Sequence, residues 1–199
     1  GNMCSYRSPR NFFISYLRDE LGRLTDIEYP ESFSESFTYD SICRVIAYRD
    51  RNDNNYSFTY DSGGRLGSIK DPLGFRERFI YDAEGRLREW INKRGYSSKI
   101  EYDVLGRPVQ WTDPSGASKT LSYDDRGNVI RFCDKSGNAW AYGYDRSGRP
   151  VSVTNPLGET WRYSYNALAK PVSRKSPTGD LWTYQYSDRR ELVTETDPL

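Results

Sequence analysis

A tyrosine recurs every 21 residues along most of this chain, in most repeats followed directly by aspartate. One step before the first of these tyrosines, the interval reaches Arg18, which is still followed by Asp19 and by Gly22. A fixed period of this length is typical of a tandem array, in which each repeat contacts only its neighbours. The recurring tyrosines, which we take as structural anchors, are Tyr39, Tyr60, Tyr81, Tyr102, Tyr123, Tyr144, Tyr165 and Tyr186.

The period also sets the predicted domain boundaries. Ser8 and Pro9 already stand in the phase of Asp71 and Pro72, so the array is predicted to span residues 8–199. Residues 1–7 are predicted to be an N-terminal segment or the remnant of a tag. The repeat units start near residues 18, 39, 60, 81, 102, 123, 144, 165 and 186.

Two turn motifs alternate within each unit. Asp-Pro-x-Gly, as at residues 71–74, and Asp-x-x-Gly, as at 61–64, both favour a type I turn that ends on a residue with positive φ. Cys43 and Asp53 stand in two of these glycine positions, while Ser32 predicts a reshaped turn. The glycine anchors of the Asp-x-x-Gly turns are Gly64, Gly85, Gly106, Gly127 and Gly148.

Apolar and polar residues alternate between the turns. Trp140, Tyr142 and Tyr144 fall two residues apart, and the residues between them are small. Period two with one aromatic face predicts half-buried β-strands, and short turns join strands antiparallel. The predicted fold is therefore all-β, with two antiparallel strands per 21-residue repeat. Because an open sheet of more than ~10 strands curls or splits, we expect a continuous curved sheet that spirals into a shell or barrel.

Composition excludes several classes of function. The net charge is +1, so no electrostatic attraction to nucleic acid is expected. No run approaches the ~20 apolar residues of a membrane span, and residues 1–17 lack the basic start and apolar core of a signal peptide. Aromatic residues make up 15% of the chain, which predicts a folded protein with an aromatic core.

The sequence gives no catalytic site, metal site or cofactor site. It contains no histidine, which removes Ser-His and Cys-His catalytic pairs. The three cysteines have neither disulfide-framework nor zinc-ligand spacing. Most aspartates fall at turn-opening positions, where capping of the backbone explains them. Residues 50–55 lack the glycine and distal glutamate of a calcium-binding loop, so we expect a polar hairpin tip. The prediction is a non-enzymatic protein.

The aromatic rows have two interpretations. Trp140, Trp161 and Trp182 could present stacking platforms to a sugar or an unfolded polypeptide. Alternatively they form the cross-strand ladder that the sheet needs for folding, which we favour. Arginines that follow the turn glycines, such as Arg65 and Arg149, could pack over tyrosine rings.

The segment Tyr60–Asp82 carries both motifs in order, Tyr-Asp-x-x-Gly-Arg-Leu and then Asp-Pro-x-Gly, and so resembles the YD repeat of the rearrangement hotspot (Rhs) proteins. The resemblance covers residues 8–199 and implies a segment of a repeat shell. Departures include Arg18 for Tyr, Ala169 for Gly, and Asn128 and Lys170 for Arg.

The resemblance implies a structural role in a bacterial polymorphic toxin system. Family shells enclose a C-terminal toxin, delivered by type VI secretion or by insecticidal toxin complexes, in competition between bacteria. The expected partners are the remainder of such a shell and its toxin domain, with self-association through edge strands. We expect a bacterial protein made in the cytoplasm and secreted or delivered without a classical signal peptide. The alternative is an adhesive or carbohydrate-binding repeat module at a cell surface.

Overall fold

The computed structural model describes residues 4–7 and 13–198, and these residues form β-strands joined by turns. The described part contains 19 strands and no α-helix; its one helical element is η1 (Pro30–Ser32), a single 3-10 turn. Two strands fall in each complete 21-residue repeat, which confirms the predicted all-β repeat fold. Residues 8–12, where the array was predicted to begin, lie outside the described part.

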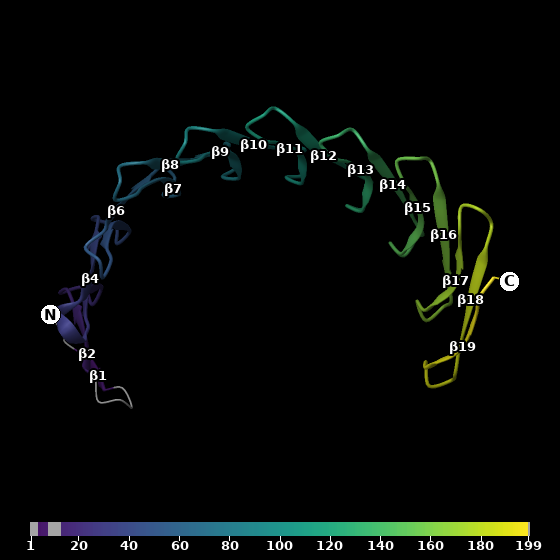
Figure 1. Ribbon diagram of the computed structural model, residues 1–199, viewed down its shortest axis with the longest axis horizontal. Helices are drawn as coiled ribbons and strands as arrows, with labels where there is room; N and C mark the ends of the chain where they lie inside the picture. Colours follow the sequence, from purple (N-terminus) through teal and green to yellow (C-terminus); the bar gives the residue numbers. More distant parts are fainter. Residues whose placement is uncertain (1–3, 8–12, 199) are drawn as a thin grey trace. The chain divides into compact units, whose positions relative to one another are not determined.

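The chain divides into two compact units, residues 1–98 and residues 99–199, and the division falls within β10 (Ser97–Tyr102). Figure 1 shows that each unit is a succession of hairpins. The strands of the first unit are β1 (Cys4–Arg7), β2 (Phe13–Arg18), β3 (Leu24–Glu28), β4 (Ser34–Tyr39), β5 (Val45–Arg49), β6 (Asn55–Tyr60), β7 (Leu66–Lys70), β8 (Arg76–Tyr81) and β9 (Leu87–Ile91). Those of the second are β11 (Pro108–Thr112), β12 (Ser118–Tyr123), β13 (Val129–Cys133), β14 (Ala139–Tyr144), β15 (Pro150–Thr154), β16 (Thr160–Tyr165), β17 (Pro171–Lys175), β18 (Leu181–Tyr186) and β19 (Leu192–Thr196).

Each strand within a unit pairs antiparallel with its neighbours in sequence. In the second unit Tyr142 of β14 lies opposite Val153 of β15, and Val153 lies opposite Trp161 of β16. Because side chains alternate between faces, this row belongs to one side of the sheet, which we call the aromatic face. The row on the other side, the polar face, includes Ser152 opposite Arg162.

A β-bulge interrupts the pairing once in each repeat. Gly143 is opposite Ser152 and Tyr144 is opposite Pro150, which leaves Val151 as an extra residue on β15. The same shift precedes the anchor tyrosine at Tyr123, Tyr165 and Tyr186 in this unit, and at Tyr39, Tyr60 and Tyr81 in the first unit. Bulges bend the strand and increase its local twist. The sequence analysis did not predict them.

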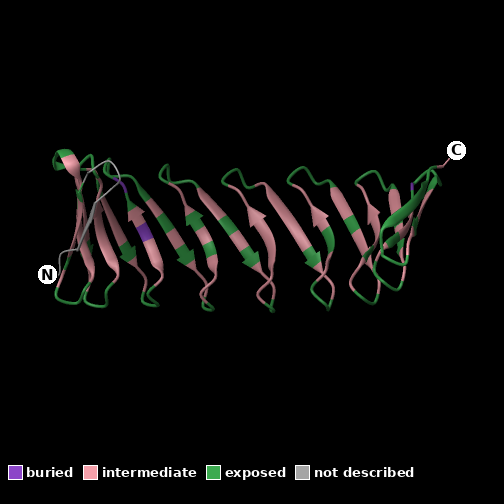
Figure 2. Cartoon of the chain, turned by 90° about the horizontal axis from the view of Figure 1, so that it is seen from below, coloured by how far each residue is buried: buried purple, intermediate pink, exposed green. Residues whose placement is uncertain are grey.

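The described sheet is a single layer. None of its hydrophobic side chains is fully buried, and the buried residues are Ser68, Asp71 and Ser176. Figure 2 shows that most strand residues are half-buried. Aromatic side chains instead pack along the sheet, as where the rings of Phe132 and Trp140 lie 5.5 Å apart. The apolar contacts of each unit are therefore made mainly within one face.

The turns at both edges use the same geometry. Gly74 has φ +90° and its N–H donates to the Asp71 carbonyl at 3.0 Å, while the Asp71 N–H donates to the Phe75 carbonyl at 2.9 Å. This is a type I turn followed by a left-handed residue. Cys43, Asp53 and Ala169 adopt the same left-handed conformation without being glycine. At η1 both Glu31 and Ser32 have φ +64°, so this turn is reshaped as Ser32 predicted.

Candidate functional site

Each Asp-x-x-Gly turn is held by its aspartate carboxylate. Asp145 Oδ1 accepts the backbone N–H groups of Ser147 at 2.8 Å and Arg149 at 3.0 Å, and Oδ2 accepts Arg149 Nε at 2.6 Å. The backbone N–H and guanidinium of Arg149 lower the pKa of Asp145, because they stabilise its charged form. Asp40 and Asp61 have the same contacts, and their pKa values are lowered for the same reason.

The arginine of each turn reaches the next repeat. Arg149 Cζ lies 5.1 Å from the centroid of the Tyr165 ring, and Nη1 donates to the Asn166 carbonyl at 3.0 Å. A guanidinium over a phenol ring is attracted by the negative ring face. The packing of arginine on tyrosine that the sequence indicated therefore occurs between repeats. The same packing occurs for Arg23 over Tyr39, Arg44 over Tyr60, Arg65 over Tyr81 and Arg107 over Tyr123, at 4.4 to 4.9 Å.

The anchor tyrosine returns the contact to the preceding repeat. Tyr165 Oη donates to the Pro150 carbonyl at 2.8 Å. The same bond, 15 residues back along the chain, is made by Tyr39, Tyr60, Tyr81, Tyr123 and Tyr144 at 2.7 to 3.0 Å. We call the Asp and Arg of one turn together with the next anchor Tyr the inter-repeat clasp. Its three side chains account for the Tyr, Asp and Arg of the Tyr-Asp-x-x-Gly-Arg consensus.

Two repeats in the second unit depart from the clasp in instructive ways. Asn128 replaces the arginine and keeps one bond to Asp124 Oδ2, at 2.8 Å, but brings no charge to the Tyr144 ring. Lys170 keeps the charge and lies 5.9 Å from the Tyr186 ring centroid. Tyr144 still donates to the Val129 carbonyl at 2.9 Å. The tyrosine hydrogen bond therefore persists where the cation is lost.

The turn glycines singled out in the sequence have positive φ angles, in the left-handed region. Their φ angles are +79° at Gly64, +89° at Gly85, +82° at Gly106, +88° at Gly127 and +78° at Gly148. A Cβ at Gly85 would also come within 2.8 Å of Arg65 Nη1. At this position glycine provides both the backbone conformation and the space for a clasp arginine.

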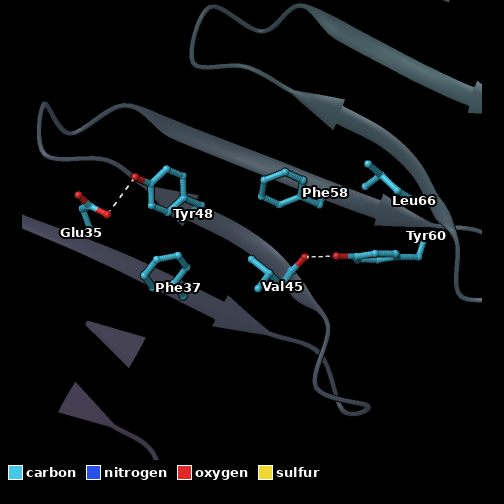
Figure 3. Close-up of a pocket in the computed structure, with 7 residues that line it drawn as sticks. All are labelled: Glu35, Phe37, Val45, Tyr48, Phe58, Tyr60 and Leu66. Carbon is cyan, nitrogen blue, oxygen red and sulfur yellow. Dashed lines mark hydrogen bonds between the residues drawn. The ribbon is translucent and has the colours of Figure 1, made fainter. Parts of the chain in front are cut away.

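The aromatic face of the first unit is hollowed by a cavity of about 500 Å³, shown in Figure 3. Phe37 of β4 and Phe58 of β6 line it, and Tyr48 lies on β5, the strand between these two. The rings of Phe37 and Tyr48 are 5.1 Å apart. Glu35 is the one carboxylate among the residues that line the cavity, and the other lining residues are aromatic or aliphatic.

Glu35 is fully engaged by its neighbours. Its oxygens accept Arg51 Nε at 2.7 Å, Tyr29 Oη at 3.1 Å and Tyr48 Oη at 3.1 Å. Burial raises the pKa of Glu35, but these hydrogen bonds outweigh it and lower the pKa overall. Arg51 also stacks 3.4 Å from the Tyr29 ring centroid. A carboxylate held ionised in this way has no proton to donate at neutral pH, and the cavity offers an apolar surface rather than a reactive group.

The three tryptophans singled out in the sequence occupy the aromatic face of the second unit. Trp140 packs on Phe132, whereas the rings of Trp161 and Trp182 lie 5.7 Å apart across β17. Arg174 of β17 lies beside both indoles, with Cζ 5.1 Å and 4.2 Å from their centroids. The structure thus joins Trp161 to Trp182 and gives Trp140 a different partner. Arg174 was not recognised in the sequence.

The remaining candidate residues carry no assembled reactive site. Across residues 13–198 no group of three or more Cys, Asp or Glu side chains is arranged to hold a metal ion. Cys43 is exposed at a turn, and Arg23 Nη1 lies 3.5 Å from its Sγ. The Arg131 guanidinium lowers the pKa of Cys133. In the predicted hairpin tip, Asp50 Oδ1 accepts the Asn52 and Asn54 backbone N–H groups, so this carboxylate closes the turn.

The repeats match a known family. The model of the RHS repeat matches this chain four times in overlapping registers, over residues 81–118, 102–131, 123–160 and 144–179. The chain belongs to the RHS repeat family. Each match extends over a clasp or its substituted form, so the family pattern and the contacts between repeats coincide. No curated protein matches the chain at a significant level.

Three solved structures share the fold of this chain. The crystal structure of TcdB2-TccC3-TEV has a TM-score of 0.55 at 14% identity, and that of TcdB2-TccC3-Cdc42 has 0.57 at 14%. The Tc holotoxin pore of Photorhabdus luminescens has 0.52 at 14%. The alignments cover 94%, 99% and 100% of this chain. They cover 12%, 13% and 15% of those chains, so this RHS repeat segment spans a small part of each. Across the described residues no helix has the length and apolar character to cross a membrane.

Proposed function

We propose that this RHS repeat chain is part of the wall of a shell that encloses a C-terminal toxin in a bacterial polymorphic toxin system. The single observation that carries the proposal is the one-layer sheet with an aromatic face and no fully buried hydrophobic side chain among the described residues. A continuous row of aromatic side chains that stays exposed to water is unfavourable and marks a surface that another element covers. Enclosure of the aromatic face inside a closed shell removes it from bulk solvent.

The repeat geometry supports a wall that curves continuously. Each complete repeat adds two strands, a bulge and a clasp or its substituted form, so the sheet is twisted in the same direction at each repeat. The likeness to TcdB2-TccC3 assemblies supports the same architecture, since those structures share the fold. The remainder of the shell and the toxin are the partners in this proposal. Delivery by type VI secretion or by a Tc-type complex, without a classical signal peptide, follows as part of it.

Thiol labelling on one strand tests the enclosure. Val153 and Ser152 are adjacent on β15 and belong to opposite faces, aromatic and polar. In the full-length toxin protein, with Cys4, Cys43 and Cys133 first replaced by Ser, the substitutions Val153→Cys and Ser152→Cys each introduce one thiol. The assay compares the rates of reaction with a small maleimide and with a polyethylene-glycol maleimide.

A closed shell excludes the bulky reagent from its interior. The ratio of bulky to small reagent rate should be much lower for Val153→Cys than for Ser152→Cys, and the ratio corrects for local burial at each position. Equal ratios at the two positions would refute enclosure. A lower ratio for Ser152→Cys would mean that the aromatic face is turned outward, as an adhesive module requires.

A further inference from the structure

Two indoles and two carboxylates border one cavity in the second unit. Trp161 and Trp182 line a hollow of about 280 Å³ together with Glu159, Asp180, Ser176 and Thr178, and we call this the paired-indole cavity. Its floor includes Ser176, which is only 5% exposed. Its lining shares no residue with the clasps or with the apolar cavity of the first unit.

The sequence pattern that builds the cavity occurs in two consecutive repeats. An acidic residue stands two positions before tryptophan in Glu159-x-Trp161 and again in Asp180-x-Trp182. Each acid directly precedes the strand that carries its indole, β16 or β18, and lines the cavity together with that indole. The preceding repeat has Asn138 two positions before Trp140 and provides a neutral comparison.

The indole pair already stabilises one cation without a carboxylate. Arg174 Cζ is 4.2 Å from the Trp182 centroid and 5.1 Å from the Trp161 centroid. Its Nε is buried and has no hydrogen-bond partner among the described residues. The favourable contact of this guanidinium is therefore the negative faces of the rings. Arg174 does not line the paired-indole cavity, so the cavity is a separate place on the same pair of rings.

The carboxylates of the cavity have no cationic partner in the described part of the chain. Asp180 Oδ2 accepts Thr178 Oγ1 at 2.5 Å and Ser176 Oγ at 2.9 Å, and these hydroxyl groups lower the pKa of Asp180. Glu159 Oε2 accepts Asn155 Nδ2 at 2.7 Å. Neither carboxylate belongs to an ion pair of the described residues. The hydrogen bonds fix the two negative charges beside the rings.

We infer that the paired-indole cavity binds an alkylammonium group, with Trp161 and Trp182 against its carbon atoms and Asp180 and Glu159 compensating its charge. Aromatic faces together with carboxylates are the combination that proteins use for quaternary ammonium and methylated lysine ligands. The volume admits a small head group rather than a whole folded partner. Two sources carry this chemistry, a free organic amine and a lysine side chain of a polypeptide.

Calorimetric titration of the whole chain tests the inference. The probes are choline, its neutral analogue in which a tert-butyl group replaces the trimethylammonium, and a short peptide with one lysine in free or acetylated form. Choline or the lysine peptide should bind saturably, and the neutral analogue and acetylated peptide should bind at least about tenfold more weakly. Tighter binding of the peptide assigns the site to a polypeptide lysine, and tighter binding of choline assigns it to a free amine.

Matched variants locate the binding. Glu159→Gln with Asp180→Asn preserves side-chain shape and should weaken cation binding about tenfold or more, with an unchanged far-ultraviolet circular dichroism spectrum. Trp140→Leu, in the repeat with Asn138, should leave the affinity unchanged. Absence of saturable binding by either cation, equal binding of the neutral analogue, or unchanged affinity of the double variant would overturn the inference. None of these outcomes bears on shell enclosure, which the thiol labelling tests separately.

Discussion

The tyrosine hydrogen bond of the clasp can be removed without disturbing its ring. Tyr144 donates to the Val129 carbonyl at 2.9 Å in a partly buried setting. Tyr142, two residues earlier on β14, has no hydrogen bond from its hydroxyl within the described part of the chain. Tyr144→Phe and Tyr142→Phe therefore delete the same atom from neighbouring positions of one strand. Only the first deletion breaks a contact between strands.

The expected difference follows from the value of one hydrogen bond. A net contribution of about 0.5 to 1.5 kcal/mol is typical, and an acceptor left unpaired adds to the loss. We expect Tyr144→Phe to lower the free energy of unfolding by about 1 kcal/mol. At a urea dependence of about 2 kcal/mol per molar, the midpoint moves down by about 0.5 M. Tyr142→Phe should move it by much less.

Urea unfolding followed by tryptophan fluorescence measures both variants. All tryptophans except Trp90 lie after residue 99, so the signal reports mainly on the second unit. Circular dichroism checks that both variants keep the native sheet before denaturant is added. Equal shifts for Tyr144→Phe and Tyr142→Phe would refute the assignment of the tyrosine as an energetic link between repeats.

Two further predictions concern the turns. Gly148 has φ +78° and a Cβ added there would have no neighbour nearer than 3.6 Å, so Gly148→Ala should destabilise the chain by about 1 kcal/mol through backbone strain alone. Ala169 already has φ +61°, so Ala169→Gly should stabilise the chain by about 0.5 kcal/mol. Thermal unfolding measures both changes, and stability changes of the same sign would contradict the backbone explanation. The pKa of Asp145 is lowered in the fold, so its ionised form stabilises the protein above about pH 4 and this contribution is lost as the pH falls through the native pKa. Asp145→Asn should keep the turn, as Asn166 does naturally, and should make the urea midpoint less sensitive to acid between about pH 5 and 3; an unchanged acid dependence would show that the ion pair with Arg149 contributes nothing.

The sequence predicted the strands and turns because each has a local signal. Alternation around Tyr142 and Tyr144 indicates a strand, and Asp145 to Gly148 indicates a turn, without reference to any distant residue. The bulge at Val151 has no such signal, because nothing in the sequence distinguishes this valine from one in regular strand pairing. The bond from a tyrosine to a carbonyl 15 residues back depends on how twisted strands bring the two together. Arg174 belongs to no repeated motif, and its role depends on the positions of the two indoles on the neighbouring strands.

The clasp has a consequence for how such a chain can vary in length. Arg107 contacts Tyr123 and the Asp124 carbonyl, and Tyr123 contacts the Pro108 carbonyl, so the bonds of this clasp that leave a repeat reach only the adjacent one. If 21 residues are removed or duplicated in phase with the repeat, the repeats that become neighbours still supply the Asp, Arg and Tyr of a clasp. Unequal recombination at intervals of whole repeats would thus produce genes whose proteins keep the contacts between repeats. The volume enclosed by the proposed shell could then change without any compensating substitution.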